Sequence, residues 1–199
     1  MKSRTRIALA LTTALTLAAC GTSPVPTYYS LSAATPAAAA ATAAAGVRRV
    51  VIVSTTIPDS LDRPQITLRE SGGRVSFAEY HRWSESLKSG IPRTVAAQLS
   101  QDLGGAEVWP SSQAAPADAE VRVLLDVTRF DSSLGEAAQI EVLWTVRRGT
   151  TERTGRTIAR EQTTDASYGA LVTAHAKALG AVSRDLAAAI RALPAAPAR

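Results

Sequence analysis

Cysteine and histidine are the side chains best suited to nucleophilic, acid–base or metal-binding chemistry, and this 199-residue chain has few of them. It contains one cysteine, Cys20, and two histidines, His81 and His175. The sequence has no Cys/His cluster, no phosphate-binding glycine loop and no Gly-x-Ser-x-Gly elbow. No serine, cysteine or carboxylate stands at a recognisable catalytic spacing from either histidine. We therefore predict no catalytic residue, no cofactor and no metal site.

The residues before Cys20 give this thiol a specific chemical context. A basic segment at residues 2–6 precedes an apolar stretch over residues 7–19, as in a secretory signal. The stretch is well short of the ~20 apolar residues that a helix needs to span a bilayer. Small residues at positions 18 and 19 followed by Cys20 form a lipobox, in which the thiol receives a diacylglyceryl group before cleavage. This pattern predicts a bacterial lipoprotein with signal peptide 1–19 and lipidation at Cys20, the alternative being an ordinary signal with a chance cysteine.

Length and charge limit what the remaining chain can be. Residues 20–199 are enough for one domain with a substantial core. The formal net charge is +5, but three basic residues and no acidic ones lie in the signal peptide, which leaves +2. Nucleic acid is therefore not an expected partner. We predict a lipidated N-terminus and short tether at 20–26, a single domain at 27–194 and a disordered tail at 195–199.

Hydrophobic periodicity predicts an α/β layered domain. Residues 33–46 are nearly all alanine and predict a mobile loop or a frayed helix. Helices are expected over 78–102, with either a kink or two abutting helices near Gly90 because of Pro92, and over 168–193. His81 would then lie on a solvated helix surface, and His175 would lie on or beside the apolar face of a helix, either packed or half-exposed. Strands are expected over residues 28–31, 47–54, 65–69, 74–77, 107–109, 121–127, 140–146 and, as a polar edge strand, 156–163.

Three residues are candidates for contact with a partner. Asp62 and Arg63 lie between two prolines, in a stretch that is either a rigid turn, with Asp62 accepting backbone N–H bonds, or a partner-facing loop. Trp109 stands beside a proline at an element end and is predicted to be an exposed aromatic contact, whereas Trp83 and Trp144 are predicted to be core residues.

Four arginines cluster around two glycines in a predicted hairpin tip. They could meet lipid headgroups, or the tip could be a solvated loop with Glu152 as its counter-charge. The arginines are Arg147, Arg148, Arg153 and Arg156.

The order of motifs resembles the ABC-type transport auxiliary lipoprotein family, whose members are described as PqiC-like or YmbA-like. After the lipobox come Tyr28-Tyr29-Ser30-Leu31, the Leu61-Asp62-Arg63-Pro64-Gln65-Ile66 block, Arg82-Trp83-Ser84-Glu85-Ser86-Leu87, Val142-Leu143-Trp144 and the helix that begins at Tyr168. The resemblance covers nearly all of the mature chain, and the alanine-rich segment corresponds to a loop of variable length.

This resemblance implies a three-layer α/β/α domain with a mixed sheet, similar to anticodon-binding-domain-like folds. It also implies a non-enzymatic docking role beside a PqiB-like MCE-domain lipid transport protein, and a homo-oligomeric ring. Gly21, rather than aspartate, follows the lipidated cysteine, which agrees with the outer membrane as the location. The alternatives are a cell-envelope hydrolase and a substrate-delivery lipoprotein of an ABC importer.

Overall fold

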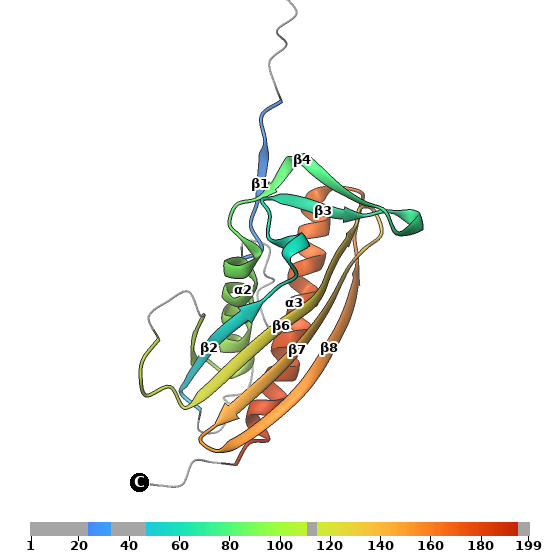
Figure 1. Cartoon of the computed structure of the whole chain (residues 1–199). Helices are drawn as coiled ribbons and strands as arrows, with labels where there is room; N and C mark the ends of the chain where they lie inside the picture. Colours follow the sequence, from blue (N-terminus) through green and yellow to red (C-terminus); the bar gives the residue numbers. More distant parts are fainter. Residues whose placement is uncertain (1–23, 33–46, 111–114, 195–199) are drawn as a thin grey trace, which may run out of the picture.

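Two β-sheets and two helices make up the part of the chain that the structure, a computed structural model, describes: residues 24–32, 47–110 and 115–194 (Figure 1). The predicted signal peptide, Cys20, the alanine-rich segment 33–46 and the tail 195–199 lie outside these ranges.

The larger sheet has five strands in the order β5-β2-β6-β7-β8. Strand β2 runs parallel to both β5 and β6, whereas β6, β7 and β8 form an antiparallel meander, so the sheet is mixed, as predicted. The polar strand expected near the end of the chain does lie at an edge. The bounds are β2 (Arg49–Thr56), β5 (Glu107–Trp109), β6 (Val121–Ser133), β7 (Ala137–Arg148) and β8 (Thr151–Gln162).

The smaller sheet has three strands in the order β1-β4-β3 and lies across one end of the larger one (Figure 1). Its strands are β1 (Thr27–Tyr29), β3 (Gln65–Arg69) and β4 (Val75–Trp83), with β1 parallel and β3 antiparallel to β4. A short 3-10 turn, η2 (Asp59–Leu61), precedes β3, and another, η3 (Ser71–Gly73), joins β3 to β4. The hairpin predicted at Ser71-Gly72-Gly73 is confirmed, and both glycines there have positive φ.

The helix predicted over 78–102 is wrong in its first part. Residues up to Trp83 belong to β4, and the helix α2 (Leu87–Asp102) begins after Ser86. Trp83, Leu87 and Ile91 share helical spacing, but the backbone around Trp83 is bonded to distant segments. Its N–H donates to the Pro64 carbonyl at 2.7 Å, and the Ser84 N–H donates to the Tyr29 carbonyl at 2.8 Å. Long-range strand pairing therefore outweighs the local helical pattern.

The second helix, α3 (Tyr168–Arg191), begins where the sequence predicts it. Its N-cap is Ser167, whose side chain accepts a hydrogen bond from the Ala170 N–H at 3.1 Å. Helix α2 is one helix with Pro92 inside it rather than two abutting ones. The two helices pack together, and Gln98 of α2 donates to the Ala176 carbonyl of α3 at 3.0 Å. Within the described ranges, neither helix has the length and uniform hydrophobicity that would let it cross a bilayer.

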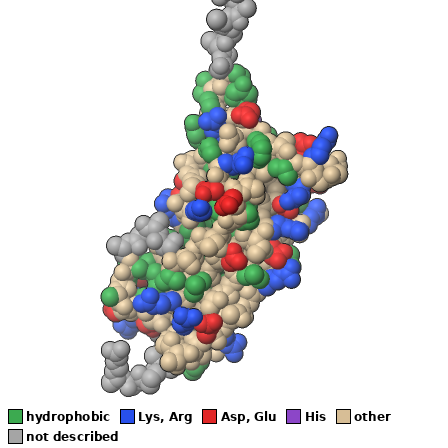
Figure 2. Space-filling view, in the orientation of Figure 1, with side chains coloured by type: hydrophobic (Ala, Val, Ile, Leu, Met, Phe, Trp, Pro, Cys, Tyr) green, Lys and Arg blue, Asp and Glu red, His purple; other side chains and the backbone are tan. Residues whose placement is uncertain are grey.

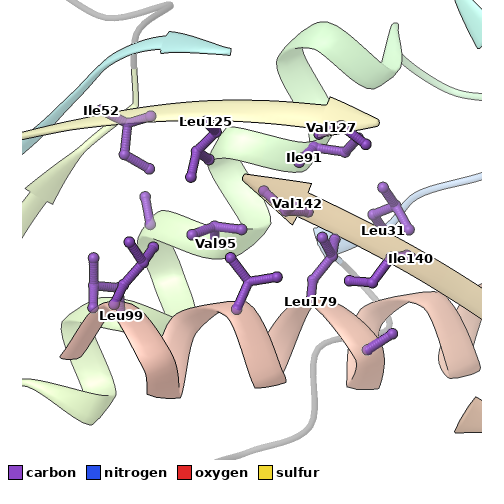
Figure 3. Packing of buried hydrophobic residues seen from close by; sticks show 14 of the residues in the cluster. Leu31, Ile52, Ile91, Val95, Leu99, Leu125, Val127, Ile140, Val142 and Leu179 are labelled. Atoms are coloured by element: carbon purple, nitrogen blue, oxygen red, sulfur yellow. The ribbon is translucent and has the colours of Figure 1, made fainter. Parts of the chain in front are cut away.

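The α/β class with mixed sheets is confirmed, but the layers differ from the expected α/β/α order. Figure 3 shows side chains from β2, β6 and β7 pointing toward those of both helices, so α2 and α3 share one face of the larger sheet. The opposite face carries Leu143 and Ile158, whose side chains are 41% and 55% exposed. The meander strands alternate between buried and exposed residues, and such strands need cover on one face only.

A β-bulge at Thr128 sets the register of β6 against β7. Before the bulge Asp126 lies opposite Leu143, and after it Arg129 lies opposite Glu141. Continued without the bulge, the first register would place Thr128 opposite Glu141, so the extra residue brings Arg129 across from this carboxylate. It also moves the buried positions of β6 from odd to even residue numbers, which turns Phe130 and Ser132 inward.

Trp83 and Trp144 pack against the core, as predicted. Trp144 of β7 lies opposite Gly155 of β8, and a Cβ at Gly155 would overlap the indole ring. The indole N–H donates to Thr157 Oγ1 at 3.0 Å, and this hydroxyl donates to Asp185 of α3 at 2.6 Å. Because Gly155 has no side chain, the Trp144 ring fits against it, and the ring is linked to α3 through Thr157 and Asp185.

We predict that Gly155→Ala destabilises the protein by about 1–3 kcal/mol, because the added methyl group forces Trp144 out of its position. Thermal and urea unfolding monitored by tryptophan fluorescence measure the change. Gly169→Ala in the first turn of α3 is the matched control, since its added Cβ would meet nothing closer than Ser167 Oγ at 3.8 Å. Equal stability of the two variants would contradict this account of Gly155.

Candidate functional site

His81 lies in an aromatic cluster rather than on a solvated helix surface. It belongs to β4, its side chain is half-buried, and its Nδ1 shares a hydrogen bond of 2.9 Å with the Tyr29 hydroxyl. The imidazole stacks on Tyr168 with ring centroids 3.8 Å apart. Burial raises the pKa of both tyrosines. The expectation of a solvated position was wrong because β1 and the start of α3 both pack on this strand.

His175 is completely buried, as its place on the apolar face of α3 predicts. Its Nε2 shares a hydrogen bond of 2.8 Å with Ser132 Oγ, and its ring stacks on Phe130 with centroids 3.9 Å apart. Its Nδ1 is buried and has no hydrogen-bond partner in the described part of the chain. Burial lowers the pKa of His175 to about 3, so the imidazole is neutral.

The Ser132–His175 pair has two members of a catalytic triad but neither the third member nor access. Among the described residues no carboxylate binds Nδ1, and Ser132 is only 2% exposed. A nucleophile must reach its substrate and needs an oriented base, and this arrangement provides neither. Sequence inspection missed the pair because the two residues are 43 positions apart and the bulge at Thr128 alone turns Ser132 inward.

Asp62 and Arg63 form a short, internally bonded turn beside the smaller sheet. Backbone bonds of the 3-10 turn η2 hold the chain here, and the Asp62 carboxylate binds Lys88 Nζ at 2.6 Å instead of capping backbone N–H groups. This contact raises the pKa of Lys88. The Arg63 guanidinium lies 3.9 Å from the centre of the Phe77 ring. The rigid turn is therefore present, but the Asp62 carboxylate is paired with Lys88 and not with the backbone N–H groups that the sequence predicted.

Trp109 lies in the larger sheet, whereas Asp62 and Arg63 lie in the turn before β3 of the smaller one, so the structure does not unite the three predicted contact residues. It ends the edge strand β5 and pairs with Val51 of β2. Val50 and Ile52 belong to the core, so Val51 and Trp109 lie on the opposite, helix-free face of the sheet. Trp109 is half-buried, and its indole N–H has no partner among the described residues.

We call this helix-free surface the open sheet face and define it by Val53, Trp109, Leu143 and Ile158. Leu143 and Ile158 are diagonal neighbours, because Leu143 pairs with Arg156 and Ile158 pairs with Glu141. Arg156 and Glu141 also form an ion pair at 2.9 Å. Figure 2 shows hydrophobic side chains scattered among charged ones on the face that it draws, a mixture typical of non-obligate interfaces.

Two of the four arginines in the hairpin tip, Arg147 and Arg156, are paired with carboxylates. Arg147 Nε donates to Glu152 at 2.8 Å, which confirms the predicted counter-charge. Arg148 reaches the end of α3 and donates to the Pro194 carbonyl at 3.2 Å. A cation at a helix C-terminus is favourable there. In the same described ranges no group of three or more potential ligands is close enough to hold a metal ion.

Comparisons with known proteins agree on fold and family. A crystal structure of an uncharacterized protein matches with a TM-score of 0.67 and 20% identity, over 84% of this chain and 99% of that one. Protein XCC0632 from Xanthomonas campestris, of the DUF330 family, matches with a TM-score of 0.55 and 20% identity, over 82% and 91% of the two chains. At these identities the likeness establishes the fold alone. A search of curated proteins found no match.

The match that identifies a class of protein, the auxiliary lipoproteins of transport systems, is to a family model. The family model for the ABC-type transport auxiliary lipoprotein component matches residues 29–187, and the chain belongs to this family.

We predict that His175 makes the fold sensitive to mild acid. Its pKa is lower in the folded protein than its ordinary 6.5, so between about 6.5 and about 3 the unfolded chain binds the extra proton. The free energy of unfolding should therefore decrease as the pH is lowered through this window, by up to about 1.4 kcal/mol per pH unit. Urea unfolding at a series of pH values measures the slope.

His175→Gln should have a shallower slope in this window than the wild type, although it is less stable at neutral pH. His81→Gln leaves His175 in place and should keep the wild-type slope. An unchanged slope in His175→Gln would contradict the assignment.

Proposed function

We propose that the protein is a lipid-anchored, non-enzymatic docking component of an intermembrane lipid transport system, with a PqiB-like MCE-domain protein as its partner. The acyl chains on Cys20 hold the domain at the outer membrane on its periplasmic side, and a rigid surface of the domain receives the transporter. The family match supports a role beside a transporter. The particular partner follows from the resemblance in motif order.

The open sheet face is the structural feature that supports this proposal most directly. A sheet that is covered by helices on one side only keeps a broad, stiff surface available for another protein. Val53, Leu143 and Ile158 provide apolar area there, and the Arg156–Glu141 ion pair provides polar contacts around it. The mixture of apolar and charged groups suits an interface that forms between separately folded proteins. Trp109 at the β5 edge extends the same face.

The buried state of the Ser132–His175 pair supports a non-enzymatic role. Substrate could reach this serine only if β6 and α3 separated, because both side chains lie inside the core. The neutral, unassisted imidazole is tied to Phe130 by stacking. These groups stabilise the fold, and we assign the protein's contribution to its position and shape.

The short connection to the anchor supports a location close against the membrane. Cys20 precedes Pro24, the first described residue, by four positions, and four residues span at most ~14 Å. Several acyl chains suit stable attachment, because a single chain binds a bilayer only reversibly. A homo-oligomeric ring, as the resemblance implies, would present several copies of the docking surface around one transporter.

We predict that Cys20→Ala releases the protein from the membrane and abolishes its contribution to envelope protection while the domain still folds. Membrane fractionation after a salt wash, together with circular dichroism of the released protein, measures both effects. Ser23→Ala in the same segment is the control and should remain membrane-bound. Retention of Cys20→Ala on the washed membranes would contradict the anchor.

We predict that Leu143→Lys combined with Ile158→Lys weakens capture of the partner. A photo-crosslinking residue placed at the edge of the open sheet face, at Trp109, should capture an MCE-domain protein in intact cells, and the double substitution should remove most of this product. Both side chains are exposed, so the expected change in stability is within about 0.5 kcal/mol per site.

Leu134→Lys is the matched control for this experiment, because Leu134 is an exposed leucine in the β6–β7 turn, away from the face. It should leave the crosslink unchanged. Capture of an ABC importer or of a second copy of this chain at Trp109 would contradict the assignment of this face to an MCE-domain protein.

A further inference from the structure

The outward side of the three-stranded sheet carries a group of exposed apolar and aromatic side chains. They are Tyr28 (60% exposed), Val75 (47%), Phe77 (41%) and Tyr80 (46%), and we call this group the aromatic face. Single exposed apolar residues are ordinary, but four of them on one small sheet indicate an interaction surface.

An irregularity in β4 places these residues on one side. Gln65 of β3 pairs with Arg82, whereas the next residue, Ile66, pairs with Ala78, so residues 79–81 are extra on β4. The buried positions change from even to odd numbers across this insertion, since Ala78 and Trp83 both face the core. Phe77 is next to the inward-facing Ala78 and points outward. Tyr80, within the insertion, lies three residues before the inward-facing Trp83 and also points outward. Tyr28 of β1 joins them because it pairs with Arg82, which lies two residues after Tyr80 and therefore on the same side of the strand.

The chemistry of the aromatic face suits the headgroup region of a bilayer. Tyrosine combines an apolar ring with a polar tip, and such side chains favour a boundary where one end is apolar and the other is wet. The Arg63 guanidinium covers one side of the Phe77 ring, and Arg82 lies beside Tyr28. Arginine can keep its apolar stem on such a surface and its charge at the phosphates.

The short segment between Cys20 and β1 indicates that a bilayer is what this face meets. Val25 is 86% exposed and stands two residues before β1 (Thr27–Tyr29), so the chain enters the domain at this sheet. Cys20 lies four residues before Pro24, a distance of at most ~14 Å. Figure 1 shows β1 and the smaller sheet at one end of the molecule, with β6, β7 and β8 extending toward the other. A lipid attached to Cys20 would therefore hold this end of the domain close to the bilayer.

We propose that the aromatic face rests in the phospholipid headgroup region and fixes the tilt of the domain on the membrane. This proposal depends on the lipidation of Cys20 in the proposed function. In this orientation Tyr28 and Tyr80 contact lipid, while Leu143 and Ile158 on the open sheet face remain in water, where a partner protein can reach them.

The test uses the full lipidated protein with one introduced thiol. Tyr80→Cys and, separately, Tyr28→Cys are labelled with an environment-sensitive, thiol-reactive dye, and Ile158→Cys is the matched control on the open sheet face. Because Cys20 is the only cysteine of the chain, an acylated Cys20 leaves the introduced thiol as the single labelling site. Each protein is reconstituted into vesicles of phosphatidylethanolamine and phosphatidylglycerol, and the dye is exposed either to lipids with brominated acyl chains or to aqueous iodide.

The expected result is loss of most dye emission with brominated lipids at both tyrosine positions, with little effect of iodide, and the reverse pattern at Ile158→Cys. Quenching at Tyr80→Cys and Tyr28→Cys by iodide alone would overturn the proposal. Protection from both quenchers would also overturn it, because it would mean that a second copy of the chain covers the face. Labelling of the unsubstituted protein would reveal a free Cys20 thiol and would contradict the anchor itself, so the two failures are distinguishable.

Discussion

The burial of α2 and α3 against a single face of the five-stranded sheet dictates which surfaces of this protein can meet other molecules. The strands of the meander send alternate side chains to opposite faces, and the inward set of β6 and β7 joins both helices in one core. Gln98 of α2, bonded to the Ala176 carbonyl, helps to keep the two helices side by side on that face. The opposite face is left without a helical cover, and a stiff sheet with exposed Leu143 and Ile158 is the consequence.

A second interaction joins the N-terminal strand to this core. The ring of His81 stacks on Tyr168 at the start of α3, and its Nδ1 is bonded to the Tyr29 hydroxyl of β1. Aromatic contacts of this kind contribute about 0.5–1.5 kcal/mol beyond their buried area. Strand β1 is the described element nearest to the proposed anchor, so a force applied through the anchor passes into α3 and the sheet. A docking component that works by position needs this mechanical continuity.

The pair of side chains that most resembles catalytic machinery, Ser132 and His175, has a structural role. Ser132 and His175 would suggest acyl-transfer chemistry if they lay in a cleft, yet they lie in the core, where burial keeps the imidazole neutral. Their contact exists because the bulge at Thr128 turns Phe130 and Ser132 inward. The same bulge brings opposite charges, Arg129 and Glu141, across from one another. One extra residue in β6 thus creates this cross-strand charge pair and shapes the buried cluster.

Local periodicity was enough to predict α3, the meander strands, the Ser71-Gly72-Gly73 hairpin and the mixed α/β class, because each depends on residues close together in the sequence. It was also enough to predict that Trp83 is a core residue and that Glu152 is a counter-charge within the hairpin tip. Tertiary structure alone decided that Ala78–Trp83 is a strand, since β1 and β3 supply its hydrogen bonds from distant positions. It alone decided that both helices share one face and that Trp109 lies in a sheet away from the turn of Asp62 and Arg63. The pattern of apolar residues determines which side chains must leave water, whereas the distant segment that covers them is selected by strand register and packing, which the pattern does not encode.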